Sequence, residues 1–157
     1  MRRILLILLL VLATAVGVDA QSIRIGEPIP SVSVSTDLNE TLDIYNRDYV
    51  CMIFAHSESK PCIDAMSNFR TTALDISDHC AIVVITNENE ADSAIIAERL
   101  SAEDHILAFD IDNRTFRAFG IHYVPFGVVY SSRNSHIVWF GPIHQLNSKV
   151  LSPQRKR

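Results

Sequence analysis

An uninterrupted apolar run, followed at once by a change of hydrophobic period, constrains the fold most strongly. Residues 49–55 (Tyr-Val-Cys-Met-Ile-Phe-Ala) are apolar and of strand length, which predicts a central parallel strand covered on both faces. After the polar residues 56–60, apolar side chains recur every three to four positions, which predicts a helix with one apolar stripe. The members of this stripe are Cys62, Met66, Phe69, Ala73 and Ile76.

The rest of the chain alternates between strand and helix patterns. We predict further strands at 81–85, 106–109, 126–130 and 136–140, the last two forming a hairpin across 131–134. Helices are predicted at 92–102, 115–119 and 143–151, and in the first of these the inward residues would be Ala94, Ile95, Ala97 and Leu100. Such alternation predicts an α/β fold with a mixed central sheet flanked by helices.

Two alternating segments precede the first apolar strand. Residues 31–35 (Ser-Val-Ser-Val-Ser) and 41–45 (Thr-Leu-Asp-Ile-Tyr) both alternate apolar with polar side chains. Residues 37–40 between them supply turn-forming side chains. This pattern predicts an added N-terminal β-hairpin with one buried face.

The N-terminus is typical of a secretory signal peptide. Arg2 and Arg3 precede an apolar stretch that continues to Val18, and Ala20 is a small residue suited to cleavage before Gln21. An uncleaved membrane anchor is the alternative, although the stretch is shorter than the ~20 residues that span a bilayer comfortably. We therefore expect an exported protein, in the periplasm or cell envelope of a Gram-negative host and otherwise secreted, with membrane contact only through an uncleaved signal peptide.

The mature chain, residues 21–157, has the length of one domain. Loss of residues 1–20 removes two of the 14 basic and one of the 18 acidic residues, which changes the net charge from −4 to −5. A mildly acidic chain without a basic stripe argues against nucleic acid as a partner. The three cysteines that remain are an odd number, so at least one thiol has no partner within the chain.

Two separated motifs carry a resemblance to a known family. Residues 54–62 (Phe-Ala-His-Ser-Glu-Ser-Lys-Pro-Cys) and 118–125 (Ala-Phe-Gly-Ile-His-Tyr-Val-Pro) are spaced as in thioredoxin-like proteins. Together with residues 26–30 (Gly-Glu-Pro-Ile-Pro), the chain resembles the exported TlpA-type thiol–disulfide oxidoreductases over residues 23–151. The resemblance implies a thioredoxin fold, with Cys62 in the first turn of a helix and a cis peptide bond before Pro125.

Ser59 stands where that family has its attacking cysteine, so the motif reads Ser-x-x-Cys. A serine hydroxyl ionises too weakly to attack a disulfide without a strong adjacent base, and dithiol exchange through this motif should be absent. We expect Ser59 to cap the helix by accepting a hydrogen bond from the Cys62 N–H, because Pro61 has none. An engineered cysteine-to-serine change at position 59 would give the same sequence.

The reactivity of Cys62 depends on opposing influences. The helix dipole and Lys60 would lower the pKa of its thiol, whereas burial and Glu58 would raise it. Ser59 and Cys62 are therefore the candidate catalytic residues. A peroxiredoxin-like peroxidase using Cys62 is a further alternative, but it would need a downstream arginine, for which the candidates are Arg114, Arg117 and Arg133.

The Val124–Pro125 segment keeps its family pattern. In the family this edge pairs with an extended substrate peptide, so Val124, Pro125, Lys60 and Pro61 are the candidate substrate-binding residues. Two function classes stay open: a monothiol redox enzyme, and a non-catalytic module that binds a peptide or a protein thiol/disulfide partner in the groove beside Pro125.

The other cysteines and the histidines suggest no cofactor. Cys51 and Cys80 fall at or near the starts of neighbouring predicted strands, where two buried free thiols are favoured over a disulfide. His56, Cys62 and His122 could converge, but no ligand pair shows metal spacing. We expect neither a metal nor another cofactor.

Overall fold

The computed structural model describes residues 23–35, 46–76, 78–100 and 105–151. The signal peptide at 1–20, the hairpin arm at 41–45, residues 101–102 of the second predicted helix and the tail at 152–157 lie outside these ranges. The elements in chain order are β1 (Tyr49–Phe54), α2 (Lys60–Ile76), β2 (Cys80–Thr86), α3 (Glu90–Leu100), β3 (His105–Phe109), α4 (Arg114–Ala118), β4 (Phe126–Ser131), β5 (Ile137–Pro142), and the 3₁₀ turns η2 (Ile143–Gln145) and η3 (Ser148–Leu151).

The five strands form one mixed sheet in the order β3-β2-β1-β4-β5. Strands β1, β2 and β3 run parallel, and β4 is antiparallel to both β1 and β5. The five strands predicted between residues 49 and 140 are all present, with bounds shifted by one or two residues. The expectation of a partly parallel α/β sheet is confirmed.

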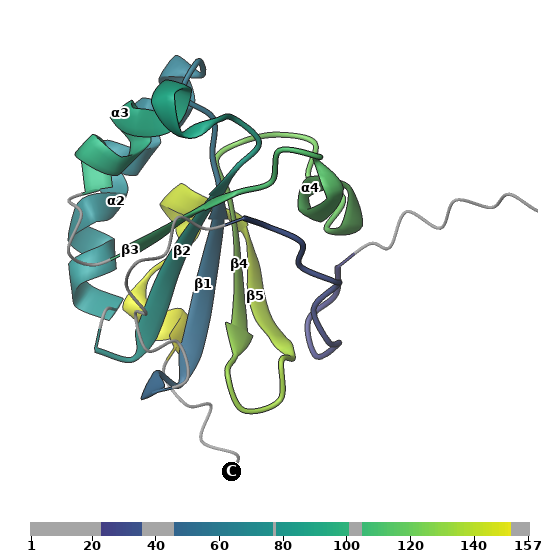
Figure 1. Cartoon of the computed structure of the whole chain (residues 1–157). Coiled ribbons are helices and arrows are strands. Elements are labelled where there is room, and N and C mark those ends of the chain that lie inside the picture. The colour runs from purple at the N-terminus through teal and green to yellow at the C-terminus, as the bar shows by residue number, and fades with distance from the viewer. Residues whose placement is uncertain (1–22, 36–45, 77, 101–104, 152–157) are drawn as a thin grey trace, which may run out of the picture.

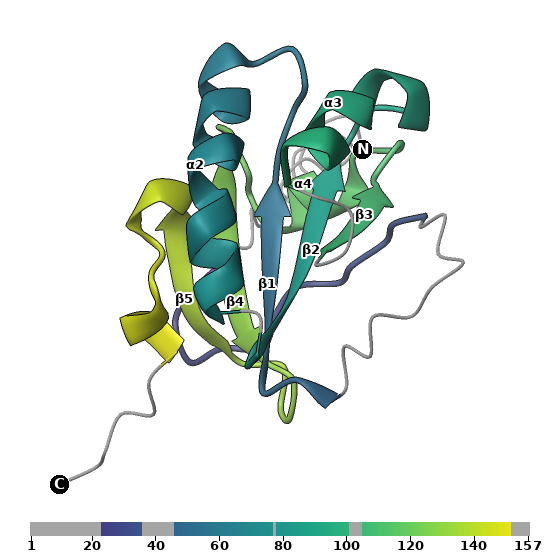
Figure 2. The ribbon, with the colours of Figure 1, turned by 90° about the vertical axis from the view of Figure 1, so that its left-hand side faces the viewer.

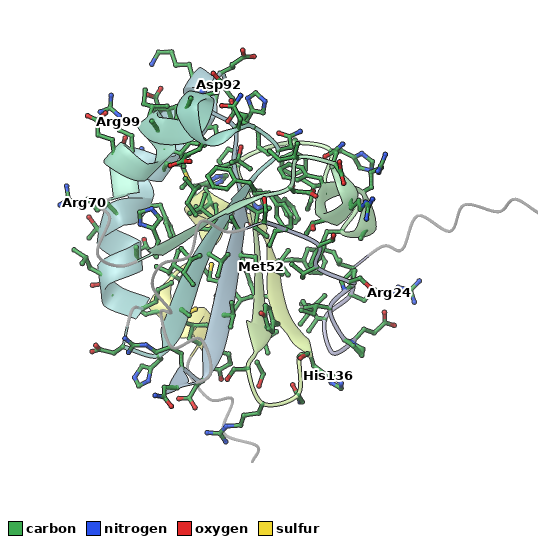
Figure 3. All side chains as sticks on the ribbon, viewed as in Figure 1. Arg24, Met52, Arg70, Asp92, Arg99 and His136 are labelled. Carbon is green, nitrogen blue, oxygen red and sulfur yellow. The ribbon has the colours of Figure 1, made fainter. Side chains whose placement is uncertain are left out.

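Different elements cover the two faces of the sheet (Figures 1 and 2). Helix α2 and the 3₁₀ turns lie on one face, and α4 and the N-terminal segment lie on the other. Side chains of β1 alternate between the two cores, so that Ile53 packs under α2 while Met52 and Phe54 pack beneath α4. Met52 points into the interior, whereas Arg70, Asp92 and Arg99 project outward (Figure 3). A central strand with apolar side chains on both faces requires both layers.

Helix α2 buries the predicted stripe. Its buried residues are Cys62, Met66, Phe69, Ala73 and Ile76, the five positions that share one face at helical spacing. Their burial against β1 and β2 fixes the helix across the sheet. No helix formed by the described residues is long and apolar enough to span a membrane.

Two of the four residues predicted to face inward on α3 are exposed, and the side chains of the other two, Ala97 and Leu100, lie outside the described part of the chain. Ile96 and Ser93 are fully buried, whereas Ala94 and Ile95 are exposed. The run Ala94-Ile95-Ile96-Ala97 allows two stripes about one residue apart, and the helix presents the one centred on Ile96. Ser93 tolerates burial because its hydroxyl donates to the Glu90 carbonyl at 3.1 Å.

The predicted hairpin arm at 31–35 is not a strand. The Thr115 hydroxyl accepts from the Ser33 N–H at 2.9 Å and donates to the Ser33 carbonyl at 3.1 Å, so a side chain occupies both backbone groups. Ser35 instead forms an isolated bridge with Phe109 on β3. At its other end the segment pairs with β5, where the Gly26 N–H donates to the Ile137 carbonyl at 2.7 Å. Residues 24–35 therefore form a strap that connects both edge strands.

The predicted final helix at 143–151 is two short 3₁₀ turns. Leu146 has extended backbone angles (φ −72°, ψ 133°) that interrupt the helix after Gln145. Asn147 then turns the chain, because its side-chain oxygen accepts from the Lys149 N–H at 3.1 Å. Local side-chain hydrogen bonding outweighs the helical spacing of the apolar residues here.

A buried carboxylate orients α4, and the sequence interpretation missed it. Asp110 is 1% exposed, and its two oxygens accept from the backbone N–H groups of Arg114 and Phe116, each at 2.8 Å. The residue at the N-cap position, Asn113, makes no side-chain cap hydrogen bond. Asp110 therefore satisfies the free N–H groups of α4 from outside the helix, where negative charge is also favoured.

Replacing Asp110 with alanine should lower the free energy of unfolding by about 2–4 kcal/mol, because two backbone donors lose a charged acceptor in a buried place. Urea denaturation followed by circular dichroism measures this loss. Asp112→Ala is the matched control: Asp112 is exposed and meets Arg114 at 3.4 Å on the surface, so we expect a loss of under ~1 kcal/mol. Equal losses in the two variants would contradict the capping role.

Candidate functional site

Three loops meet at the edge of the sheet where β1 and β2 end and β4 begins (Figure 1). Phe54, near the end of β1, stands opposite Ile85 of β2 on one side and Phe126 of β4 on the other. The loops at 55–59, 87–89 and 121–125 therefore share this edge. Cys62 and Val124 pack in the same apolar cluster beneath α2.

The Val124–Pro125 peptide bond is cis. Tyr123, just before it, is 55% exposed. Its ring packs at 90° to the ring of Phe126 in a T-shaped arrangement, with the two centroids 5.2 Å apart. Val124 and Pro125 themselves are half-buried. The loop thus offers an exposed aromatic surface beside a partly buried proline.

The remaining candidate substrate-binding residues lie at the start of α2. The Lys60 ammonium pairs with the Asp64 carboxylate at 2.8 Å on the exposed side of the helix. Pro61 is exposed at one end of a cleft of about 340 Å³ between α2 and η2. The residues lining this cleft are Pro61, Asp64, Ala65, Asn68, Phe69, Thr72, Ile143 and His144.

Ser59 caps α2 in the predicted way. Its hydroxyl oxygen accepts from the Cys62 N–H at 3.3 Å, and its carbonyl accepts from the Ile63 N–H at 3.0 Å. Pro61 removes one competing donor from the first turn. The hydroxyl is therefore engaged by the helix backbone, which leaves a structural role for Ser59.

Burial dominates the chemistry of Cys62. The residue is 0% exposed, and burial raises the pKa of its thiol above the ordinary value. The His56 backbone N–H, which donates to Sγ at 3.4 Å, opposes this and lowers the pKa, while the negative charge of Glu88 raises it further. A protonated, enclosed thiol is a poor nucleophile, because the thiolate is the reactive form.

Glu88 is a site residue that the sequence interpretation missed. Its side chain is 7% exposed, and its carboxylate accepts from Ser57 N–H at 2.7 Å, Ser57 Oγ at 2.5 Å and Thr86 Oγ1 at 3.0 Å. His56 Nδ1 lies 3.4 Å from the same carboxylate. Polar residues that directly follow a buried parallel strand are a usable signal, because such strand ends share one edge of the sheet.

The contacts of the candidate arginines and metal ligands do not support the peroxidase or the metal-site alternative. Arg114 and Arg117 contact Asp112, and Arg133 contacts Asp48 at the opposite end of the sheet. Within the described ranges no group of three His, Cys, Asp or Glu side chains could hold a metal ion. The His56 ring lies beside Glu88, and its Nδ1 accepts from the Glu58 N–H at 3.3 Å.

The two other cysteines are free thiols in the core. Cys51 of β1 and Cys80 of β2 lie on neighbouring strands and in the same apolar cluster as Cys62. A hydrogen bond with Cys80, and then burial, raises the pKa of the Cys51 thiol well above its ordinary value. Both cysteines act as small apolar residues in this structure.

Comparison with solved structures identifies the architecture. The chain superposes on the thioredoxin domain of a thiol–disulfide oxidoreductase from Bacteroides vulgatus with a TM-score of 0.63, 17% identity, and coverage of 83% of this chain and 94% of that one. The fold is thioredoxin-like. A thiol:disulfide interchange protein from a Bacteroides species matches with a TM-score of 0.62 and 16% identity, over 83% of this chain and 87% of that one.

A third similar structure is a Chlorobium tepidum protein named as thiol:disulfide interchange protein DsbE. Its TM-score is 0.64 at 18% identity, with 77% of this chain and 86% of that chain covered. No protein-family profile and no curated protein sequence matches this chain. The likeness to oxidoreductases of the DsbE/TlpA type is thus a likeness of fold at low sequence identity.

Replacing Ser59 with alanine should reduce the free energy of unfolding by about 1 kcal/mol, because the Cys62 N–H loses its acceptor. Chemical denaturation measures the change. Ser67→Ala is the control, since the Ser67 hydroxyl lies on the exposed side of α2 and donates to the Ile63 carbonyl at 3.0 Å, and it should stay within ~0.5 kcal/mol of wild type. An unchanged stability in Ser59→Ala would remove the capping role.

Proposed function

We propose that this chain is an exported, TlpA-like thioredoxin-fold protein that binds a polypeptide partner and has lost dithiol exchange. One observation carries the proposal: the side chains at both positions of the redox motif have structural roles. Ser59 gives its hydroxyl to the helix backbone, and Cys62 is fully buried with a raised thiol pKa. Neither can act as the attacking sulfur that exchange requires.

The surface that we propose for partner binding is exposed, and it lies on the loop at 121–125, at the same end of the sheet as Ser59 and Cys62. Tyr123 is more than half exposed on a loop held by Phe126 and by Val124, which packs into both cores. Exposed, rigid aromatic side chains are the usual anchors of protein–protein contacts. An extended peptide or a protein thiol/disulfide partner beside Val124 and Pro125 is the occupant that the resemblance implies, with Lys60 and Pro61 at the margin of that surface.

Export is part of the proposal. The signal-peptide pattern of residues 1–20 supports a periplasmic or cell-envelope location in a Gram-negative host, and secretion in another host.

A monothiol role of Cys62 would need the loop over its sulfur to open. The burial of that sulfur therefore favours the binding module over the redox enzyme.

Installing the missing sulfur tests the loss of exchange. Wild-type protein should reduce insulin disulfides no faster than dithiothreitol alone, whereas Ser59→Cys, with a thiol at the α2 N-terminus three positions from Cys62, should accelerate the reaction roughly tenfold or more. Ser67→Cys adds an exposed thiol farther along α2 and should not accelerate it. Activity in the wild-type protein would refute the proposal, whereas no activity in Ser59→Cys would show that the missing sulfur alone does not account for the loss, because Cys62 must also act as the resolving thiol.

Partner binding can be measured without disulfide chemistry. Reduced, carboxymethylated α-lactalbumin is unfolded and cannot exchange disulfides, so binding to it should shift the backbone amide resonances of residues 121–127 in NMR titrations. Tyr123→Ala should weaken this binding roughly three- to tenfold. Leu74→Ala removes a similarly exposed apolar side chain from the C-terminal half of α2 and should leave binding unchanged; equal losses would argue against a specific surface.

A further inference from the structure

Two consecutive backbone amides of the loop after β1 point at two different acidic groups. The His56 N–H donates to Cys62 Sγ at 3.4 Å, and the Ser57 N–H donates to Glu88 Oε2 at 2.7 Å. The sulfur and the carboxylate are therefore joined by neighbouring peptide units. Glu88 reaches this place from the segment after β2, so the contact links two loops of the sheet edge.

Glu88 fastens the loop that covers the sulfur. Ser57 binds the carboxylate through both its backbone N–H and its hydroxyl, and Thr86 adds a third donor from the end of β2. A charged acceptor with several donors in a nearly buried place makes strong hydrogen bonds. Residues 56–57 are held in position, and Cys62 beneath them has no exposed surface.

Glu88 acts on the sulfur in two ways. As an anchor it keeps the His56 N–H aimed at Sγ, and as a negative charge it disfavours a second negative charge on that sulfur. The pKa of the Cys62 thiol is raised by burial first, lowered by the His56 N–H, and raised by Glu88. A substitution that removes the charge but keeps the hydrogen bonds separates the two effects.

Among the described residues, the other charged or titratable groups near this sulfur come from α2, the loop, the strands and η2. On α2, the Lys60 ammonium is turned to Asp64. The loop itself contributes His56, whose ring faces Glu88, and the exposed Glu58. From the strands, Cys51 and Cys80 share the apolar cluster with Cys62, and from η2 only the exposed His144 borders the cleft beside Pro61.

We propose that Glu88 is a positioning residue for Cys62: its carboxylate fastens residues 56–57 over the sulfur and keeps that sulfur in the protonated, unreactive form. The Glu88 carboxylate therefore determines whether Cys62, the remaining thiol of the motif, is reactive. Removing its charge should turn Cys62 into a more acidic thiol, and weakening its hold on Ser57 should open the way to the sulfur.

Glu88→Gln is the informative variant, because its amide oxygen can still accept from the Ser57 N–H and the Thr86 hydroxyl, and its NH2 group can donate to the Ser57 hydroxyl. The titration of Cys62 is followed by the ¹³Cβ resonance in cysteine-labelled protein, which needs no solvent access, with Cys62→Ala to assign the signal. We expect the midpoint to fall by roughly one pH unit, a roughly tenfold larger thiolate fraction below the midpoint. An unchanged midpoint overturns the proposal.

Two further variants sharpen the result. Glu90→Gln makes the same charge change at an exposed position two residues away and should leave the midpoint unchanged; an equal shift would mean a general charge effect and would overturn the proposal. Ser57→Ala keeps the charge but removes one anchor, so iodoacetamide should label Cys62 several-fold faster at fixed pH. Labelling at the wild-type rate would refute the anchoring role, even if Glu88→Gln failed to fold.

The inference stands apart from partner binding. Its readouts are the titration and labelling of one thiol in the full chain, with no polypeptide present. A negative result at Glu88 would leave binding at Tyr123 intact, and absence of binding would leave the thiol measurements interpretable.

Discussion

Strand β1 imposes the constraint on which the other features depend. Its side chains are buried on both faces, so the sheet must carry a layer on each side, and no polar group can be accommodated along the strand. Polar chemistry is therefore confined to the end of the strand, where the chain leaves Phe54 and returns as α2. Since β2 is parallel to β1, its own polar extension, with Glu88, arrives at the same edge.

The site differs from a dithiol centre in where its polar groups point. Ser59 and the Ser57 N–H, which could serve a substrate or a sulfur anion, are turned inward to the α2 backbone and to a carboxylate. The thiol of Cys62 and the carboxylate of Glu88 accept from two consecutive backbone N–H groups of the same loop. Cys62 then contributes packing volume in an apolar cluster, a role that a free cysteine fills well.

Elements held by simple periodicity could be predicted from the sequence. The sequence of α2 allows only one apolar stripe, and its five residues are the buried ones. Apolar runs of strand length located β1, β2 and β4. Where the sequence allowed two stripes, as in α3, the choice depended on tertiary packing against Ile96. The N-terminal arm and the final helix failed because side chains of Thr115 and Asn147 capture backbone groups locally.

In the candidate site, too, the local contacts could be predicted from the sequence and the contacts between loops could not. The Ser59–Cys62 hydrogen bond is local and follows from capping chemistry and the missing N–H of Pro61. Glu88 and Asp110 act across loops that only the folded sheet brings together, and both carboxylates sit in segments that read as ordinary polar turns. Which acid would influence Cys62, Glu58 or Glu88, was a question of three-dimensional placement, and the nearer residue in sequence was the wrong one.

The strap of residues 24–35 has a consequence for the order of assembly. This segment is synthesised before every strand of the sheet, yet its partners are Ile137 on β5 and Phe109 on β3. Its contacts with β5 can form only after the most C-terminal strand has formed its edge, and such long-range closure is slow to form. The N-terminal half of the strap is thus the last part to find its place, so a nascent chain stays open at the β5 edge until nearly the whole sequence is available.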